Sequence, residues 1–423
     1  MTEMNSPGKN WRVILTLVIS ALGILFFIVQ ALALGVFWLT SFLDPIISMP
    51  ESVSIGLFFW TSVLGGLMLI PVLLLSIYYL QGKPVPGWLD LTRPAFGKRL
   101  RWVILAWPVL VLLGWWITSQ EGLAVFLLGP INVLVAGLPI LWIFNAAQSG
   151  LSGGSHMRKW RIFGFSITLL PILVILVELL AIVFLGGLGW VYVGLRTAAD
   201  PQIERDIAYL TNQFMVYGED VDALIQFLKP YFLQPSIIFW ALAIIGGIIP
   251  IIEEVIKPLA LWTLAGRKIT PQEGFVGGLL CGAGFALMEN VFYFTTVLLA
   301  EEWLFMAIGR AGTGVLHMLA SGLVGWGLAA AWRERKWAFL ALTTLGAFIL
   351  HGVWNILAVL SGVVPLLILE SEPTSLELLV SHAPVVLLLI ISIFGLFFIN
   401  RHLRAKEGDV LLSTVESQGE GSI

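Results

Sequence analysis

Residues 237–264 read IIFWALAIIGGIIPIIEEVIKPLALWTL, a stretch long enough to cross a lipid bilayer as a helix. Three charged residues, Glu253, Glu254 and Lys257, interrupt this otherwise apolar stretch. A charged side chain at the centre of a bilayer costs about 2.5–3.5 kcal/mol on insertion scales. Three such residues in one span therefore indicate a functional site inside the membrane.

The next three hydrophobic stretches also carry polar groups near their middles. These groups are Glu289 and Asn290 in 282–299, His317 in 303–332, and His351 with Asn355 in 337–360. With a helical rise of about 1.5 Å per residue, Glu254, Glu289, His317 and His351 lie roughly 20 to 27 Å from the charged loops at one end of their spans. We therefore expect these four side chains to converge at one depth, with Lys257 close to a carboxylate.

The composition identifies a membrane protein. The chain has 423 residues, of which 58% are hydrophobic and 12% charged, and its mean hydropathy is +0.95. These values exclude an ordinary soluble globule and a disordered chain. Repeated apolar runs of about 20 residues favour helices over the alternating strands of a barrel. We predict an all-α, polytopic bundle of ten spans, at 12–40, 55–80, 102–118, 122–147, 162–193, 236–265, 272–299, 303–332, 337–360 and 378–400.

The distribution of positive charge predicts the orientation of these spans. Most of the 23 Lys and Arg residues fall in loops that share one face when the N-terminus is placed in the cytoplasm. The positive-inside rule then predicts that both termini are cytoplasmic and that the protein crosses the cell membrane several times. No basic patch of the kind that binds nucleic acid lies outside these loops. The lipid bilayer is therefore an expected partner and nucleic acid is not.

Composition also suggests a division into parts. Residues 1–195 are expected to form an N-terminal five-span extension, and 235–402 a membrane core plus the final span. Between them, 196–234 is an external acidic segment in which Asp200-Pro201 and Gly218 predict two short amphipathic helices. The polar residues 403–423 are expected to be a disordered cytoplasmic tail.

Small residues recur on the helices that carry the buried polar groups. Gly274, Gly278 and Gly282 follow one another in steps of four, and Ser321 with Gly325 forms another such step. This pattern predicts close contact between helix backbones in lipid. The single cysteine, Cys281, excludes an internal disulfide and a thiolate metal cluster, and we interpret it as a packing residue.

The spacing of the polar residues indicates the chemistry that they can perform. Lys257 follows Glu253 and Glu254 by four and three residues, and Asn355 follows His351 by four, so each set shares a helix face. A carboxylate in a partly wet, low-dielectric pocket is suited to act as general base for a water molecule. Histidines can bind a metal, donate to an oxyanion or shuttle protons, and the spacing does not choose among these roles.

Four segments together resemble a known family. They are EEVIK at 253–257, FALMENVFY at 285–293, His317 followed by small residues, and HGVWN at 351–355. In this order, on four successive spans, they resemble the motifs of the PrsW-type intramembrane proteases, which are related to the CAAX prenyl endopeptidases. The likeness covers about residues 236–360. The EExxK motif alone would be a weak signal, whereas four motifs in order are specific.

The resemblance implies hydrolysis of peptide bonds of membrane-anchored protein substrates, in regulated proteolysis. It implies that Glu253 and Glu254 activate water, and that Lys257 orients or neutralises them. Glu289 stands where the prenyl endopeptidases have a histidine, which makes this site more acidic. The expected catalytic set is Glu253, Glu254, Lys257, Glu289, His317, His351 and Asn355.

The resemblance leaves two versions of this hydrolysis open. In one, Glu289, His317 and His351 bind a metal, with zinc as the expected cofactor. In the other, hydrolysis is metal-free, and the histidines and Asn355 stabilise the tetrahedral oxyanion.

Two other classes of protein could use the same residues. An ion- or proton-coupled transporter or channel would use the buried charges as a relay. A non-catalytic membrane scaffold would need them only for folding specificity. A transporter needs pathways to both faces of the membrane, whereas an enzyme needs a pocket open to one side.

Overall fold

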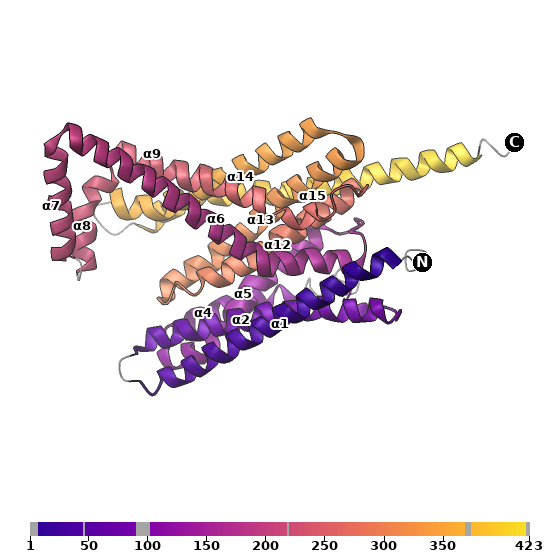
Figure 1. Ribbon diagram of the computed structural model, residues 1–423, viewed down its shortest axis with the longest axis horizontal. Helices are drawn as coiled ribbons and strands as arrows, with labels where there is room; N and C mark the ends of the chain where they lie inside the picture. The colour runs from indigo at the N-terminus through magenta and orange to yellow at the C-terminus, as the bar shows by residue number, and fades with distance from the viewer. Residues whose placement is uncertain (1–6, 45–46, 90–101, 218–219, 369–373, 420–423) are drawn as a thin grey trace. The chain divides into compact units, whose positions relative to one another are not determined.

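The computed structural model describes residues 7–44, 47–89, 102–217, 220–368 and 374–419 (Figure 1). Every regular element in these ranges is helical, which confirms the predicted all-α class. Nine of the described helices are long and apolar enough to cross a membrane. They are Trp11–Ser41, Met49–Leu80, Gly122–Ala147, His156–Ala199, Pro235–Trp262, Pro271–Tyr293, Ala300–Glu334, Trp337–Gly362 and Leu379–Ala405. The chain is thus a polytopic helical membrane protein.

The third predicted span, 102–118, differs from the others. Here the structure has α4 (Ala106–Thr118), an apolar helix of 13 residues. At about 1.5 Å per residue it is roughly 20 Å long, which is shorter than a hydrocarbon core of about 30 Å. A count of ten full-length spans is therefore not reached among the described residues.

The chain divides into two compact units that are interleaved in sequence. Unit 1 comprises Met1–Pro171, Glu254–Leu350 and Leu389–Ile423, and unit 2 comprises Ile172–Glu253 and His351–Leu388. Helices α6 (His156–Ala199), α10 (Ile249–Ile256), α14 (Trp337–Ile368) and α15 (Ser375–Gly419) contribute residues to both. The division at 195 and 235 suggested by composition remains an interpretation of the sequence.

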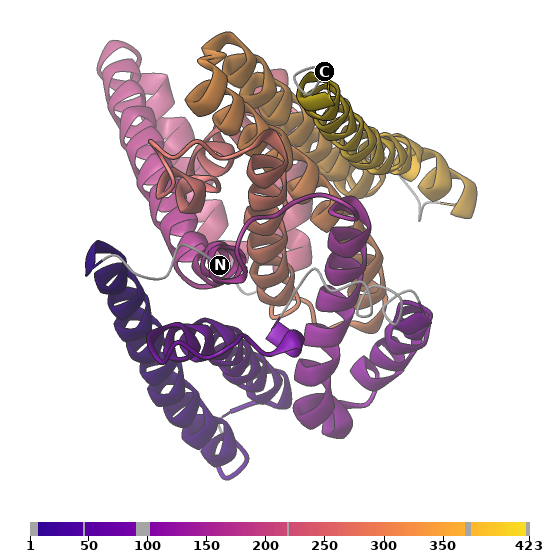
Figure 2. The ribbon, with the colours of Figure 1, turned by 90° about the vertical axis from the view of Figure 1, so that its right-hand side faces the viewer.

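The N-terminal part of unit 1 is built from helices that pack in sequence order. Helix α1 (Pro7–Ser41) lies beside α2 (Met49–Leu80), as the two indigo ribbons of Figure 2 show. A capping box between Ser48 and Glu51 starts α2, because each side chain accepts a backbone N–H of the other residue. The single turn η1 (Gly87–Leu89) follows, and α5 (Glu121–Ala147) packs on both α4 and α2.

The core of unit 1 is the antiparallel pair α12 (Pro271–Tyr293) and α13 (Ala300–Glu334), whose ribbons lie side by side in Figure 1. A Cβ on Gly278 would clash with the backbone carbonyl of Ser321, and one on Gly282 would clash with that of His317. The predicted small-residue contact is therefore present, and it fixes the register of the two helices. Cys281 on α12 is buried, as expected for a packing residue.

Unit 2 contains the two short helices that the sequence predicted in the acidic segment. They are α7 (Pro201–Tyr217) and α8 (Val221–Phe232). The ring of Phe227 lies 6.2 Å from that of Tyr209 and 5.8 Å from that of Tyr217, which ties α8 to α7. Helix α9 (Pro235–Ala243) follows and continues as a π-helical segment, η2 (Ile244–Ile248), which leads into α10.

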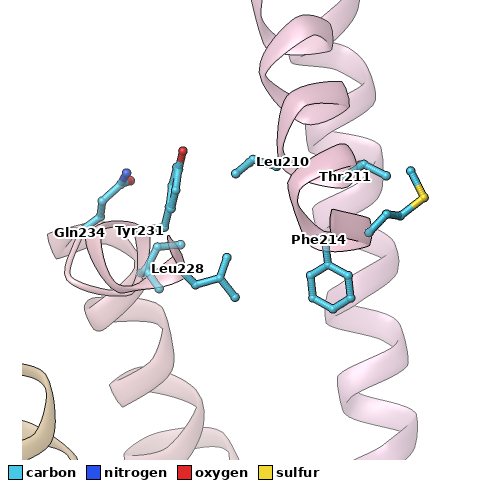
Figure 3. Close-up of a pocket in the computed structure, with 8 residues that line it drawn as sticks. Leu210, Thr211, Phe214, Leu228, Tyr231 and Gln234 are labelled. Atoms are coloured by element: carbon cyan, nitrogen blue, oxygen red, sulfur yellow. The ribbon is translucent and has the colours of Figure 1, made fainter. Parts of the chain in front are cut away.

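An apolar pocket of about 570 Å³ lies between α7 and the α8–α9 connection. Figure 3 shows its lining, with Leu210, Thr211 and Phe214 on one side and Leu228, Tyr231 and Gln234 on the other. None of the predicted catalytic residues lines it.

The C-terminal tail differs from the prediction. Helix α15 continues to Gly419, so residues 403–419 are helical rather than disordered, and 420–423 lie outside the described residues. Extending an existing helix adds one hydrogen bond per residue without a new nucleation cost, which composition alone does not register.

Candidate active site

The polar residues of unit 1 form a continuous chain of contacts that is buried at Glu254, Lys257 and His317 and largely buried at Glu289. We call it the buried chain of contacts. Lys257 Nζ donates to Glu254 Oε1 at 2.8 Å, and neither side chain is exposed to solvent. Glu254 lies on α10, and Lys257 lies in the turn that follows it, where Pro258 ends the helix. The expectation that Lys257 lies close to a carboxylate is confirmed. The ion pair offsets part of the large cost of burying each charge alone.

Both ring nitrogens of His317 are engaged. Nδ1 lies 2.8 Å from Lys257 Nζ, and Nε2 lies 2.8 Å from Glu289 Oε2. An ammonium group has three donors and no acceptor, so Nδ1 accepts and the ring proton sits on Nε2, which donates to Glu289. Three of the four residues expected at one depth, Glu254, Glu289 and His317, are therefore linked through Lys257.

Aromatic rings line this chain of contacts. Lys257 Nζ lies 4.4 Å from the centroid of the Phe285 ring, in cation–π geometry. The same ring meets the imidazole of His317 edge to face, with centroids 5.3 Å apart. Phe285 thus covers one side of the ammonium and restricts the orientation of the histidine.

Arg310 completes the chain of contacts, although it was not among the site residues predicted from the sequence. Its Nη2 lies 2.6 Å from Glu289 Oε2, and its Nε donates to Asn290 Oδ1 at 2.7 Å. The amide of Asn290 returns a hydrogen bond to the Arg310 carbonyl at 3.1 Å. The ring of Tyr293 lies under the guanidinium at 4.4 Å. The missed signal was the spacing of seven residues between Arg310 and His317, which places both on one face of α13.

The remaining predicted residues belong to unit 2. Glu253 and His351 are both buried, and Glu253 Oε2 lies 3.9 Å from His351 Nε2. This separation is too long for a hydrogen bond but short enough for an electrostatic attraction when the ring is protonated. The prediction that His351 joins Glu254, Glu289 and His317 stays a prediction.

Asn355 has a structural contact that the sequence did not suggest. Its Nδ2 donates to the carbonyl of Ile245 at 3.1 Å, inside the π-helical segment. A π-helical turn shifts the backbone bonding pattern, and such turns are frequent at functional sites. Nearby, a Cβ on Gly352 would clash with the carbonyl oxygen of Gly246, so the two backbones touch. Asn355 thus holds the backbone that leads to Glu253.

The chemistry of the buried side chains is suited to a divalent metal. Glu253, Glu254, His317 and His351 are all buried and each offers an oxygen or nitrogen ligand atom. These are the ligand types that zinc prefers in catalytic sites. In unit 1, Glu254 Oε1 and His317 Nδ1 already face a cation, the ammonium of Lys257. The residues present therefore fit a metal ion.

Comparison with known proteins identifies part of the chain. Residues 207–391 match the family model described as PrsW family intramembrane metalloprotease. No curated protein and no solved structure matches the chain. The match includes every residue of the buried chain of contacts and confirms the resemblance found in the four motifs. It makes the protein a peptide hydrolase of the membrane.

Proposed function

With residues 207–391 as a PrsW-type protease domain, we propose that the protein cleaves membrane-anchored protein substrates in or next to the bilayer, in regulated proteolysis. The observation that carries this proposal is the buried chain of contacts from Glu254 through Lys257 and His317 to Glu289. Such a costly set of charges in an apolar bundle is expected where chemistry requires it. The family match favours a protease over a transporter that uses the same charges.

We assign the general base to Glu253. Glu254 is held by Lys257 in an ion pair at 2.8 Å, which keeps it ionised and limits its freedom to accept a proton from water. Glu253 Oε2 lies 3.9 Å from His351 Nε2, beyond hydrogen-bonding distance, so this contact does not hold the Glu253 carboxylate as the 2.8 Å ion pair holds Glu254. Glu253 would deprotonate the attacking water and then deliver the proton to the leaving amine.

Glu289 acts as a positioning residue in this proposal. Its carboxylate contacts both Arg310 and His317, so it fixes the ring of His317 and selects the tautomer with the proton on Nε2. This is the usual role of a carboxylate behind a ligating histidine. The sequence suggested the ligand set Glu289, His317 and His351. We propose that Glu254 takes the place of Glu289 and ligates the metal together with His317, and the role of His351 as a ligand stays a prediction from the sequence. A zinc ion held there would polarise the substrate carbonyl and acidify a bound water.

Asn355 is also a positioning residue in this proposal. Its hydrogen bond to the Ile245 carbonyl supports the π-helical segment, which ends five residues before Glu253. The direction in which α10 presents Glu253 depends on this segment.

A cleavage assay with purified protein tests the function. The protein is incubated with a panel of tagged membrane proteins and compared with Glu253→Gln. We expect defined fragments from the wild type and none from the variant, because the amide cannot accept the proton. Cleavage by a folded Glu253→Gln protein at the wild-type rate would refute the assignment of the base.

Elemental analysis of the same preparation tests the metal. We expect close to one zinc ion per protein molecule. A chelator should remove this zinc together with activity, and His317→Ala should lower the zinc content. Full activity in a preparation without metal would favour the metal-free version, in which the histidines stabilise the oxyanion. A lost oxyanion donor then reduces turnover by about 10²–10³.

A further inference from the structure

Lys257 occupies the position of a cation between two of the proposed metal ligands. Its Nζ lies 2.8 Å from Glu254 Oε1 and 2.8 Å from His317 Nδ1, and the Phe285 ring closes a third side at 4.4 Å. A carboxylate oxygen, an imidazole nitrogen and an aromatic face are all groups that attract positive charge. The site is thus complete for a cation, and the chain supplies that cation itself.

This arrangement and a bound metal exclude each other at His317. Nδ1 has one lone pair, which the ammonium uses, and Nε2 donates its proton to Glu289. A metal ion must therefore take the lone pair of Nδ1 from Lys257. If the ammonium stayed in place, its charge would also repel the metal at close range in a medium of low dielectric.

We infer that Lys257 is a tethered competitor for the metal, which fills the cation site in the metal-free protein and must withdraw from Glu254 and His317 before a divalent ion binds. The inference rests on the proposed metal centre. It assigns Lys257 a role in metal affinity in addition to neutralising the Glu pair. It also explains how the buried carboxylate of Glu254 and the buried ring of His317 are tolerated when no metal is bound.

Lys257 variants test this inference in the full-length protein, stripped of metal and kept in detergent at one pH. Zinc binding is measured by competition with a chromophoric chelator. We expect Lys257→Met to bind zinc about 10- to 100-fold more tightly than the wild type, the range that corresponds to removing one competing hydrogen bond to a charged group. Lys257→Gln should show the same direction of change, and its amide can still donate to Glu254, which protects folding. Lys257→Arg keeps the charge and should bind zinc no more tightly than the wild type.

A matched control removes a lysine elsewhere. Lys268 is exposed, in the loop before α12, and Lys268→Met should leave zinc affinity unchanged. As a second measurement, zinc should raise the thermal unfolding temperature of Lys257→Gln more than that of the wild type, because stabilisation by a ligand grows with its affinity.

The possible outcomes separate this inference from the metal centre itself. Equal or weaker zinc binding by both Lys257→Met and Lys257→Gln, with binding still lost in His317→Ala, would overturn the competitor role and leave the metal centre intact. If no variant showed zinc binding that is lost on His317→Ala, both the competitor role of Lys257 and the proposed metal centre would be overturned.

Discussion

Arg310 Nη2 lies 2.6 Å from Glu289 Oε2, across the contact between α13 and α12. The side chains are only 14% and 18% exposed, so the pair is largely shielded and cannot be treated as a surface salt bridge. The position of the pair follows from the helix register. Gly278 faces Ser321 and Gly282 faces His317, so one further step of seven residues on each helix brings Glu289 opposite Arg310.

A double-mutant cycle should detect this pair. Arg310→Met leaves Glu289 with one partner fewer, and we expect it to destabilise the fold by about 3–5 kcal/mol, the usual cost of breaking a buried pair. Glu289→Gln in the same protein should recover part of this loss, because it removes the uncompensated charge. Thermal unfolding in detergent measures both effects. Strictly additive losses would show that the two groups do not interact.

The two adjacent glutamates should respond differently to neutralisation. Glu253→Gln should be inactive with a thermal stability near that of the wild type. Glu254→Gln should be inactive and also less stable, by about 3–5 kcal/mol, because the ammonium of Lys257 loses its charged partner. Cleavage assays and unfolding curves on the same samples check both points. Equal stability of the two variants would argue against the Glu254–Lys257 ion pair.

The glycine contact between α12 and α13 predicts a strong position dependence. A Cβ on Gly282 would meet the backbone carbonyl of His317, whereas a Cβ on Gly309 of α13 would meet no atom within 4 Å. Gly282→Ala should therefore cost at least about 1–3 kcal/mol, as overpacking does, and should reduce activity by displacing His317. Gly309→Ala is the matched control and should be neutral or slightly stabilising. Similar unfolding temperatures for the two variants would contradict the close contact.

A similar comparison tests the π-helical segment. Gly352 touches the backbone at Gly246, whereas Gly362, on the same helix α14, has no atom within 4 Å of a Cβ position. We expect Gly352→Ala to lower kcat more than it raises KM, because it moves the backbone that presents Glu253. Asn355→Ala should do the same, and Gly362→Ala should leave both constants unchanged. A change in KM alone for Gly352→Ala would instead indicate a role in substrate binding.

Several features of the site could be read from single helices. The pairing of Lys257 with a carboxylate follows from a spacing of three residues and from the cost of an isolated charge in lipid. The proximity of Glu254, Glu289 and His317 agrees with their similar distances from the charged ends of their spans, which were counted along each span separately. These properties depend on residue spacing within single helices, so they can be predicted from the sequence.

Other features depend on contacts between helices, and the sequence analysis missed them. Arg310 was not among the predicted site residues, but Glu289 and Asn290 on the neighbouring helix hold it in the site. The contact of Asn355 with Ile245 requires a π-helical turn, for which residue spacing gives no direct signal. Both depend on register or on local backbone bonding that arises only on packing.

The close contact of α12 and α13 also determines which kinds of sequence change the site can tolerate. Inserting one residue between Gly282 and Glu289 would rotate every later side chain of α12 by about 100° around the helix axis. The glycines of α12 would remain packed against α13, so α12 could not rotate about its axis to restore the original position of Glu289. Glu289 would leave His317 and Arg310 while the hydrophobic composition of the span stayed the same. The length of this seven-residue interval is therefore expected to be constrained more tightly than the identity of the apolar residues within it.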